Sequence, residues 1–340
     1  MSRLRRRAAL MAAVALTTLV AACGDGDGGG GSGSIAEDYD LSDDQLNERG
    51  GGDTTRFVVG SKDFEEQEIL GQITLQALQA AGAEVVDSTA LGSTEQVRGA
   101  LVAGDIDMYW EYTGTGALIH LAQADPPADA GELFDRVAEL DLDRNGIAWL
   151  PAAPADNTYA LVARTEIYDE GSAGYDADIA AVTRISDLAK LVKQSPDKAT
   201  VCVGPEFNER ADGLPGLEQQ YGFRFPDAQV FVLPDPTVYE AVDAGSRCTF
   251  GSVFATNGLI SELDLRSLED DDDFFAAYNP ALTLQAETLE KYPDLEPMFD
   301  DIAGRLDTET LRDLSAQVLV DKRSAEDVAA DWLAEQGLVE

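Results

Sequence analysis

Histidine is almost absent from this sequence, since His120 is the only one among 340 residues. A Ser-His or Cys-His catalytic pair would have to use His120, which lies in the apolar stretch 117–122 and is expected to be structural. The sequence also has no P-loop, no H-E-x-x-H motif and no cluster of cysteine ligands. These absences argue against an enzyme, and no cofactor is expected. A hydrolase that uses carboxylates alone stays an alternative, although no acid–base pair is indicated.

Basic residues are scarce, with 24 Lys and Arg against 64 Asp and Glu, so the formal net charge is −40. A nucleic-acid partner is excluded, because binding needs a cationic surface that displaces counterions from phosphates. We interpret the acidity as a solvated surface, including the run Asp270–Asp273. Residues 141–146 copy the first half of an EF-hand loop, but position twelve is Ala152 where a glutamate is needed. No metal site is expected.

The first 22 residues have the layout of a signal peptide. Four arginines between positions 3 and 7 precede an apolar run, 8–22, that is too short for a membrane span. Val20-Ala21-Ala22-Cys23 resembles a lipobox, which predicts a lipidated Cys23; the alternative is an ordinary signal peptide. Residues 23–55 are expected to be a flexible tether, with poor order over 35–56. We expect a protein anchored by lipid to the extracytoplasmic face of the cell membrane.

Only three cysteines are present, and lipidation would account for Cys23. Cys202 and Cys248 then remain as an even pair outside the cell, where disulfides persist. Both are expected within strands of the second half of the chain. The prediction is a Cys202–Cys248 disulfide, and the alternative is two buried thiols.

The run from Phe57 to Leu118 predicts a β-α-β-α-β module. The expected elements are a strand at 57–59 that breaks at Gly60, a helix from Asp63 to Gly82, a strand at 84–86, a helix opening at 91–94 and ending at Gly104, a strand at 105–110, and a turn at 111–115. Asp63 and Glu66 form a potential capping box. Helical connections make the strands parallel, and ligands then bind beyond the strands' carboxyl ends. Lys62 and the 112–115 segment follow two such ends, which suits a small ligand with a negative group.

The rest of the chain is expected to complete this first unit and to form a second α/β unit. The expected elements are strands at 147–150, 157–162, 199–204, 230–233 and 248–254, helices at 131–143, from 185, at 238–244 and within 287–336, and a loop at 206–210. The chain is expected to cross between units near 157–162 and to return through 274–280. Lobe I would comprise 56–157 plus 279–340, and lobe II 158–278. Two crossings predict a hinge with a cleft between two α/β lobes.

Several motifs in one order carry a resemblance that covers most of the chain after residue 56. They are Gly-Ser-Lys-Asp-Phe-Glu-Glu-Gln at 60–67, Leu-Gly-Ser-Thr at 91–94, Gly-Asp-Ile-Asp at 104–107, Glu-Tyr-Thr-Gly-Thr at 111–115, Asn-Thr-Tyr-Ala at 157–160, Asp-Gly-Leu-Pro-Gly-Leu at 212–217 and Asp-Thr-Glu-Thr at 307–310. Together they resemble the glycine betaine/carnitine/choline-binding proteins of ABC transporters, the OpuAC/ProX-like family. The resemblance implies the type II periplasmic-binding-protein fold.

The resemblance also implies a binding site. Its aromatic box would fall on Tyr112, Tyr159, Phe254 and Tyr278, and its carboxylate-binding residues on Lys62, Thr115 and Arg210, with Asn157 beside the box. A quaternary ammonium group cannot donate hydrogen bonds, so electron-rich ring faces are its natural partners. Two positions depart from the family pattern: Phe254 stands where a tyrosine is common, and Asn157 where some members have an acid.

The function that the resemblance implies is capture of glycine betaine or a related quaternary-ammonium solute, such as choline, carnitine or proline betaine, and delivery to an ABC permease. One alternative is a receptor of the same fold for another small solute, such as an amino acid or ectoine. The others are an exported hydrolase that depends on His120 and a purely adhesive surface protein. The family's pattern of several rings around one site favours the first interpretation.

Overall fold

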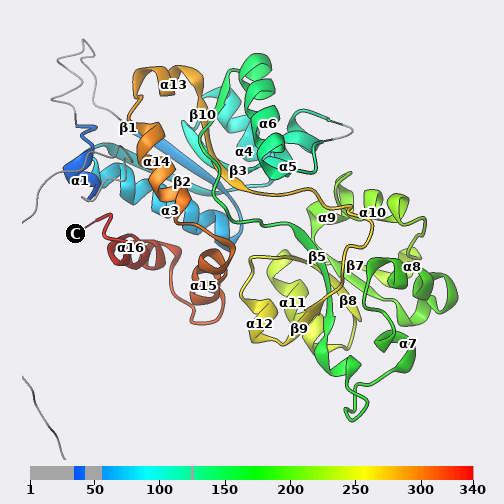
Figure 1. Cartoon of the computed structure of the whole chain (residues 1–340). Helices are drawn as coiled ribbons and strands as arrows, with labels where there is room; N and C mark the ends of the chain where they lie inside the picture. The colour runs from blue at the N-terminus through cyan, green and yellow to red at the C-terminus, as the bar shows by residue number, and fades with distance from the viewer. Residues whose placement is uncertain (1–33, 43–55, 124–125, 340) are drawn as a thin grey trace, which may run out of the picture. The chain divides into compact units, whose positions relative to one another are not determined.

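The computed structural model describes residues 34–42, 56–123 and 126–339 (Figure 1). The predicted signal peptide, Cys23 and most of the predicted tether lie outside these residues. The expectation of poor order over 35–56 is wrong for residues 35–42, where α1 (Ile35–Asp38) forms. Ile35 and Leu41, each 2% exposed, belong to the hydrophobic core. These two apolar side chains therefore anchor the polar segment 35–42 to the hydrophobic core.

The first sheet has the strand order β2-β1-β3-β10-β4. Its strands are β1 (Arg56–Lys62), β2 (Glu84–Gly92), β3 (Met108–Tyr112), β4 (Ile147–Trp149) and β10 (Pro280–Gln285). β1 is parallel to β2 and to β3, as predicted. β10 runs antiparallel between β3 and β4 and was not predicted. The sheet is thus completed by a segment that returns from the far end of the sequence.

Three predicted strands in this sheet have wrong bounds. β2, predicted at 84–86, continues to Gly92. β1 does not break at Gly60 but continues to Lys62. β3 begins at Met108 and continues to Tyr112, so the predicted turn at 111–115 starts two residues too early. The chain then forms one helical turn, α5 (Thr113–Thr115), and a π-helix, η1 (Gly116–His120).

Helices cover both faces of the first sheet (Figure 1). One face packs against α3 (Glu65–Ala80), α13 (Ala286–Lys291), α14 (Leu295–Gly304), α15 (Thr308–Leu319) and α16 (Ala325–Glu335), and the other against α4 (Thr94–Ala103) and α6 (Ala130–Asn145). The predicted stripe of α3 is confirmed, since Ile69, Ile73 and Ala77 are fully buried. The predicted capping box is wrong: α3 begins after Phe64 without a side-chain cap, and Glu66 is buried.

The second sheet has the order β7-β6-β8-β5-β9. Its strands are β5 (Tyr159–Arg164), β6 (Val201–Val203), β7 (Val230–Val232), β8 (Phe250–Phe254) and β9 (Leu265–Ser267). β6 is parallel to β7 and β8, whereas β5 runs antiparallel between β8 and β9. The two sheets therefore have the same arrangement. In each, one antiparallel strand, β10 in the first sheet and β5 in the second, follows directly after the chain crosses from the other sheet.

Shorter helices pack around the second sheet. They are η2 (Thr165–Tyr168), α7 (Ala177–Ala180), α8 (Ile185–Gln194), η3 (Pro196–Lys198), α9 (Pro205–Glu209), α10 (Leu214–Gln220), η4 (Asp227–Gln229), α11 (Asp235–Ala244) and α12 (Leu259–Glu262). The predicted loop at 206–210 is wrong, because most of it forms α9. We call each sheet with the helices packed on it a lobe.

The two passages between the lobes lie side by side. Asn157 N donates to Tyr278 O at 3.0 Å, and Tyr278 N donates to Asp156 Oδ1 at 2.8 Å. Asn279 Nδ2 donates to Ala155 O at 2.7 Å. Backbone and side-chain hydrogen bonds thus join two segments that are more than a hundred residues apart in sequence, as a two-crossing hinge requires.

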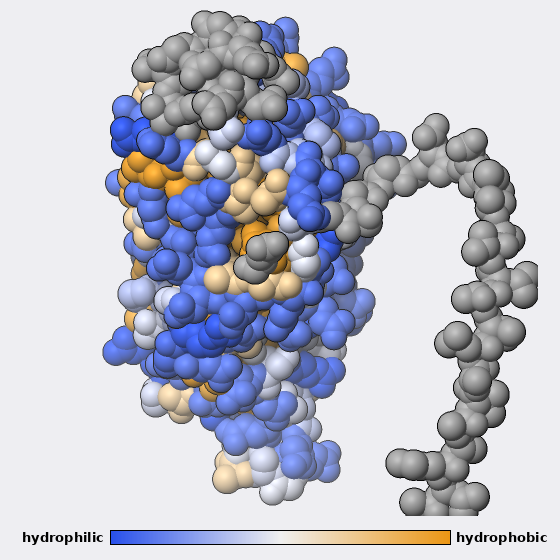
Figure 2. Space-filling view, turned by 90° about the vertical axis from the view of Figure 1, so that its left-hand side faces the viewer, coloured by the Kyte–Doolittle hydropathy of each residue, from blue (hydrophilic) through white to orange (hydrophobic). Residues whose placement is uncertain are grey.

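The surface is strongly hydrophilic on the face shown in Figure 2, with small apolar patches between charged residues. Of the acidic run, Asp271–Asp273 are exposed, as expected, while Asp270 is half-buried and accepts from Tyr221 Oη and Phe275 N. Within the described part of the chain, every helix is too short or too polar to traverse a bilayer.

Cys202 and Cys248 are joined by a disulfide, with Cα atoms 5.6 Å apart and a sequence separation of 46. Cys202 lies in β6, and Cys248 comes just before β8, the strand parallel to β6. The bond therefore links β6 to the segment that leads into β8, and the expectation that Cys248 lies within a strand is wrong.

Reduction of this bond should lower the free energy of unfolding by about 2–4 kcal/mol, because the unfolded chain then regains the freedom of a long loop. Urea denaturation with and without dithiothreitol measures the change. A Cys202→Ala/Cys248→Ala variant is the control, and it should not respond to the reductant. Equal stability of the oxidised and reduced wild type would contradict the prediction.

Candidate functional site

One pocket between the lobes gathers all eight residues expected at the binding site. It is lined by Lys62, Phe64, Tyr112, Thr115, Asn157, Tyr159, Glu206, Arg210, Phe254 and Tyr278. Two of these, Phe64 and Glu206, were not among the expected site residues. The pocket is the candidate functional site because chemically matched residues from distant parts of the sequence meet there.

The first lobe contributes residues from the carboxyl ends of parallel strands. Lys62 ends β1, Tyr112 ends β3, and Thr115 follows in α5. Phe64 sits in an extended conformation immediately before α3. This agrees with the general position of ligand sites in α/β sheets, beyond the carboxyl ends of the strands.

The second lobe and the crossings contribute the other side. Tyr159 begins β5 and Phe254 ends β8, and the two are paired directly across the antiparallel ladder. Arg210 follows α9. Asn157 and Tyr278 lie on the two crossings, next to each other through the Asn157 N to Tyr278 O hydrogen bond. Any change in the angle between the lobes would therefore change the shape of this pocket.

Five aromatic rings form a continuous series around the pocket. Phe64 is stacked on Phe254, with ring centroids 5.3 Å apart, and lies nearly parallel to Tyr112 at 6.4 Å. Tyr159 is 5.1 Å from Phe254 and 5.8 Å, edge to face, from Tyr278. The stacked Phe64–Phe254 pair joins a ring of the first lobe to a ring of the second.

Lys62 is held by a buried carboxylate. Its Nζ atom donates to Glu111 Oε1 at 2.6 Å and lies 5.1 Å from the centroid of the Tyr112 ring. The other oxygen of Glu111, Oε2, accepts from Tyr109 Oη at 2.9 Å and lies 2.8 Å from His120 Nε2. Although burial opposes it, the charge of Lys62 and the hydrogen bond from His120 hold the pKa of Glu111 well below its usual range. His120 is thus part of a structural network, as expected.

Arg210 connects the second lobe to the first. It pairs with Asp212 through Nε at 2.8 Å and with Glu206 through Nη1 at 2.9 Å. Its Nη2 atom donates to Thr115 Oγ1 across the pocket at 3.3 Å. Asp212 also accepts from Tyr278 Oη at 2.6 Å. The guanidinium group is therefore oriented by two carboxylates and aimed at the first lobe.

Glu66 is a third buried acidic centre and lies behind the rings. It accepts from Tyr112 Oη at 2.7 Å, from Asn157 Nδ2 at 2.9 Å and from Thr256 Oγ1. Burial raises the pKa of Glu66, and the three hydrogen bonds oppose that rise. The first turn of α3 is thereby tied to β3, to one crossing and to the second lobe.

Sequence reasoning missed five residues of this arrangement: Phe64, Glu66, Glu111, Glu206 and Asp212. Phe64 carried a signal, as an aromatic residue next to the expected helix start, whereas Glu66 was assigned to a capping box. Glu111 and Asp212 lie inside quoted motifs but were given no role. The carboxylates could not be paired with their cations before the fold was known, because the partners Lys62 and Glu111 lie 49 residues apart.

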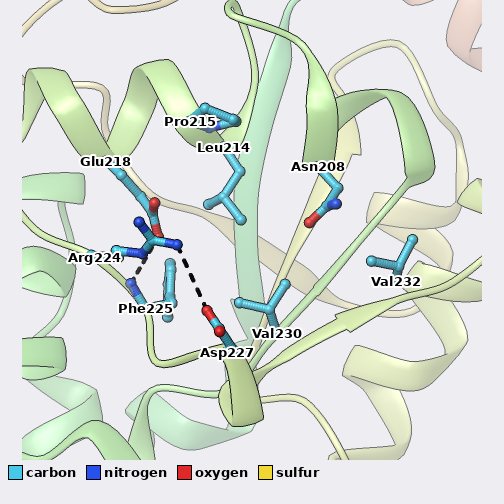
Figure 3. A pocket seen from close by; sticks show the side chains of 9 residues that line it. All are labelled: Asn208, Leu214, Pro215, Glu218, Arg224, Phe225, Asp227, Val230 and Val232. Carbon is cyan, nitrogen blue, oxygen red and sulfur yellow. Dashed lines mark hydrogen bonds and ion pairs between the residues drawn. The ribbon is translucent and has the colours of Figure 1, made fainter.

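A more open groove lies on the second lobe between α9, α10 and β7 (Figure 3). Its charged residues Arg224 and Asp227 are highly exposed and face each other at 3.8 Å. Glu218 Oε1 accepts from Phe225 N at 2.8 Å. None of the expected site residues lines this groove, and its exposed ion pair contributes little. It is therefore not the candidate site.

The resemblance of residues 141–146 to a calcium loop has a structural explanation. Asp141 is buried within α6, where it accepts from Arg98 Nη2 at 2.5 Å, Trp149 Nε1 at 2.8 Å and Asn145 Nδ2 at 2.7 Å. A helical segment with its first carboxylate fully engaged cannot wrap around an ion.

Residues 56–335 match the family described as the substrate binding domain of ABC-type glycine betaine transport systems. A glycine-betaine-binding protein of Pseudomonas aeruginosa is 33% identical over 287 residues, which are 83% of this chain and 88% of that protein. The glycine betaine-binding protein YehZ of Escherichia coli is 31% identical over 284 residues, 82% of this chain and 90% of that one. The apo structure of YehZ superimposes with a TM-score of 0.61, covering 84% of this chain and all of the other.

Glu65, next to Glu66, gives the lobe interface a pH-dependent element. Its carboxylate accepts from Asn257 Nδ2 of the second lobe and lies 3.4 Å from Ser315 Oγ. Burial raises the pKa of Glu65 to about 7. A raised pKa means that the folded state favours the protonated carboxyl group of Glu65. This preference stabilises the folded state fully below about pH 4.5, and the stabilisation is lost as the pH rises through 7.

Glu65→Gln should flatten the pH dependence of stability over that range. Relative to the variant, the wild type should lose at most about 3 kcal/mol of unfolding free energy between pH 4.5 and 8. Urea denaturation at several pH values, at constant ionic strength, measures this difference. Parallel stability curves for the two proteins would show that Glu65 titrates normally.

Proposed function

The chain belongs to the family of substrate binding domains of ABC-type glycine betaine transport systems, and we propose that it captures glycine betaine or a related quaternary-ammonium solute, such as choline, carnitine or proline betaine. It then delivers the solute to an ABC permease for osmoprotectant uptake. The family consists of binding proteins, so the expectation that the chain is not an enzyme is confirmed. The predicted type II periplasmic-binding-protein fold, with two α/β lobes and two crossings, is also confirmed.

The observation that carries the proposal is the convergence of rings from both lobes on one pocket. Tyr112, Tyr159, Phe254 and Tyr278 form the walls of the proposed box, and Phe64 closes it from the first lobe. Each ring face in contact with a quaternary ammonium group contributes about 0.5–2 kcal/mol. Because Phe254 keeps a ring face, the loss of a hydroxyl group there leaves the box complete.

The carboxylate of the solute is assigned to Lys62, Thr115 and Arg210, with Asn157 beside the box. Lys62 Nζ gives one hydrogen bond to Glu111, and an ammonium group has three protons to donate. Arg210 Nη2 points to Thr115 across the pocket, so a carboxylate placed there could accept from both. The site then has an aromatic end and a donor end, which matches a zwitterion of this size.

The lobe boundaries that fit this function are 56–157 plus 279–340 for lobe I and 158–278 for lobe II. With these limits, Asn157 and Tyr278 lie at the two crossings, where a hinge would move them least. Lipidation of Cys23 after removal of residues 1–22 would anchor the protein to the extracytoplasmic face of the membrane, and residues 23–55 would tether it near the permease.

Calorimetry on the box tests this function. Wild-type protein should bind glycine betaine, and Tyr159→Ala should weaken binding at least tenfold, about 1.4 kcal/mol, because one wall is lost. Tyr159→Phe is the matched control and should bind as the wild type does, since it keeps the ring. Wild-type affinity in Tyr159→Ala would remove Tyr159 from the box. Binding of an amino acid or ectoine, with no response to any quaternary amine, would establish the alternative receptor.

Lys62→Gln should weaken glycine betaine more than choline, which carries a hydroxyl group in place of the carboxylate. The ratio of the two affinities is the decisive quantity, because a general disturbance of the Lys62–Glu111 pair lowers both equally. We expect this ratio to fall about tenfold. An unchanged ratio would mean that Lys62 only neutralises Glu111.

A further inference from the structure

Glu66 differs from the other carboxylates around the pocket in its partners. Glu111 pairs with Lys62, and both Glu206 and Asp212 pair with Arg210. Glu66 is only 3% exposed, yet its three partners, Tyr112, Asn157 and Thr256, are all neutral donors. Among the residues that the structure describes, no cationic side chain forms an ion pair with it.

A buried carboxylate without a cation is costly unless a charge arrives from elsewhere. Two of the donors to Glu66, Tyr112 and Asn157, also line the pocket. The third, Thr256, belongs to the second lobe just after β8. The carboxylate therefore lies immediately behind the aromatic box, on the side where the crossing meets the rings.

We propose that Glu66 supplies the negative charge that selects a quaternary ammonium cation in the aromatic box. The proposal rests on the function proposed above and extends it to a residue outside the pocket lining. Glu66 acts as a positioning residue with an electrostatic effect, since it works through Tyr112 and Asn157 and does not touch the solute itself.

Two physical effects support this role. A phenol that donates its hydrogen bond to a carboxylate carries more electron density in its ring, so the Tyr112 face attracts a cation more strongly. In addition, an uncompensated negative charge in a water-poor site acts over several ångströms, because little solvent screens it. Asn157 contributes no charge of its own, and Glu66, which accepts from its amide, places a charge beside that position.

The role can be measured with a pair of ligands that differ only in charge. Glycine betaine and 3,3-dimethylbutanoate have the same shape and the same carboxylate, but a carbon replaces the nitrogen in the second. The wild type should bind glycine betaine more tightly. Glu66→Gln should lower the affinity for glycine betaine about tenfold and leave that for 3,3-dimethylbutanoate within a factor of two, so that the preference largely disappears.

Glu65→Gln is the matched control. It makes the same change from a carboxyl group to an amide at the adjacent residue of the same helix, and Glu65 also accepts across the lobes, from Asn257. However, its contacts do not include the box, so it should keep the preference for the cation. A Glu66→Gln/Asn157→Asp variant moves the carboxylate to the neighbouring side chain and should regain a preference for glycine betaine. This double variant also serves as the test if Glu66→Gln alone is poorly folded.

The outcomes separate the two proposals. Equal losses of affinity for both ligands in Glu66→Gln would mean that Glu66 only holds the lobes together. An unchanged preference for glycine betaine would mean that the charge of Glu66 does not act on the bound cation. Either result overturns the inference while the proposed function stands. Wild-type protein that binds no quaternary amine would instead overturn the proposed function, and the role of Glu66 with it.

Discussion

The contact between the two lobes of this protein depends on charged groups that are buried there and must find partners. Burying a carboxylate or an ammonium group without a partner costs several kcal/mol, so each one restricts the relative position of the groups around it. Arg210, aimed at Thr115, and Glu66, which accepts from Thr256, both take partners from the opposite lobe. The polar contacts thus define one way for the lobes to meet.

The aromatic rings follow from that polar framework. Phe64 precedes the turn of α3 that Glu65 and Glu66 fasten to the second lobe, so its ring is carried onto Phe254 as a consequence. Tyr112 and Tyr278 are each fixed by a hydrogen bond from the phenol group to a carboxylate, Glu66 and Asp212 respectively. Rings that are oriented in advance lose little entropy on binding, which favours affinity for a small solute.

The sequence was sufficient for the parts of the fold that depend on local pattern. The stripe of α3, the parallel strands around it and the end of α4 at Gly104 all follow from spacing and helix-ending residues. The strand β10 was not predictable in the same way. It lies in the middle of the first sheet only because the chain returns from the second lobe, and its register against β3 is set over a separation of more than 160 residues.

The candidate site shows the same limit in its chemistry. Motif resemblance indicated which rings and cations to examine, and the structure brings all eight together. The motif resemblance did not indicate which charged groups neutralise one another. Glu66 was assigned to a helix cap because Asp63 and Glu66 have the spacing of a capping box. Local spacing cannot distinguish a carboxylate that turns back to its own helix from one that turns inward to three distant donors. That distinction depends on tertiary contacts alone.

The acidity of the whole chain and the charge of the site act at different ranges. A net charge of −40 attracts cations to the surface in general, but salt screens this attraction beyond about 10 Å. A zwitterion such as glycine betaine has no net charge, so this long-range field cannot select it. Selection must come from within the pocket, where the ammonium and carboxylate ends are separated by only a few ångströms. In the proposed site, the carboxylate of Glu66 next to the Tyr112 hydroxyl and the donors Lys62 and Arg210 would supply that field.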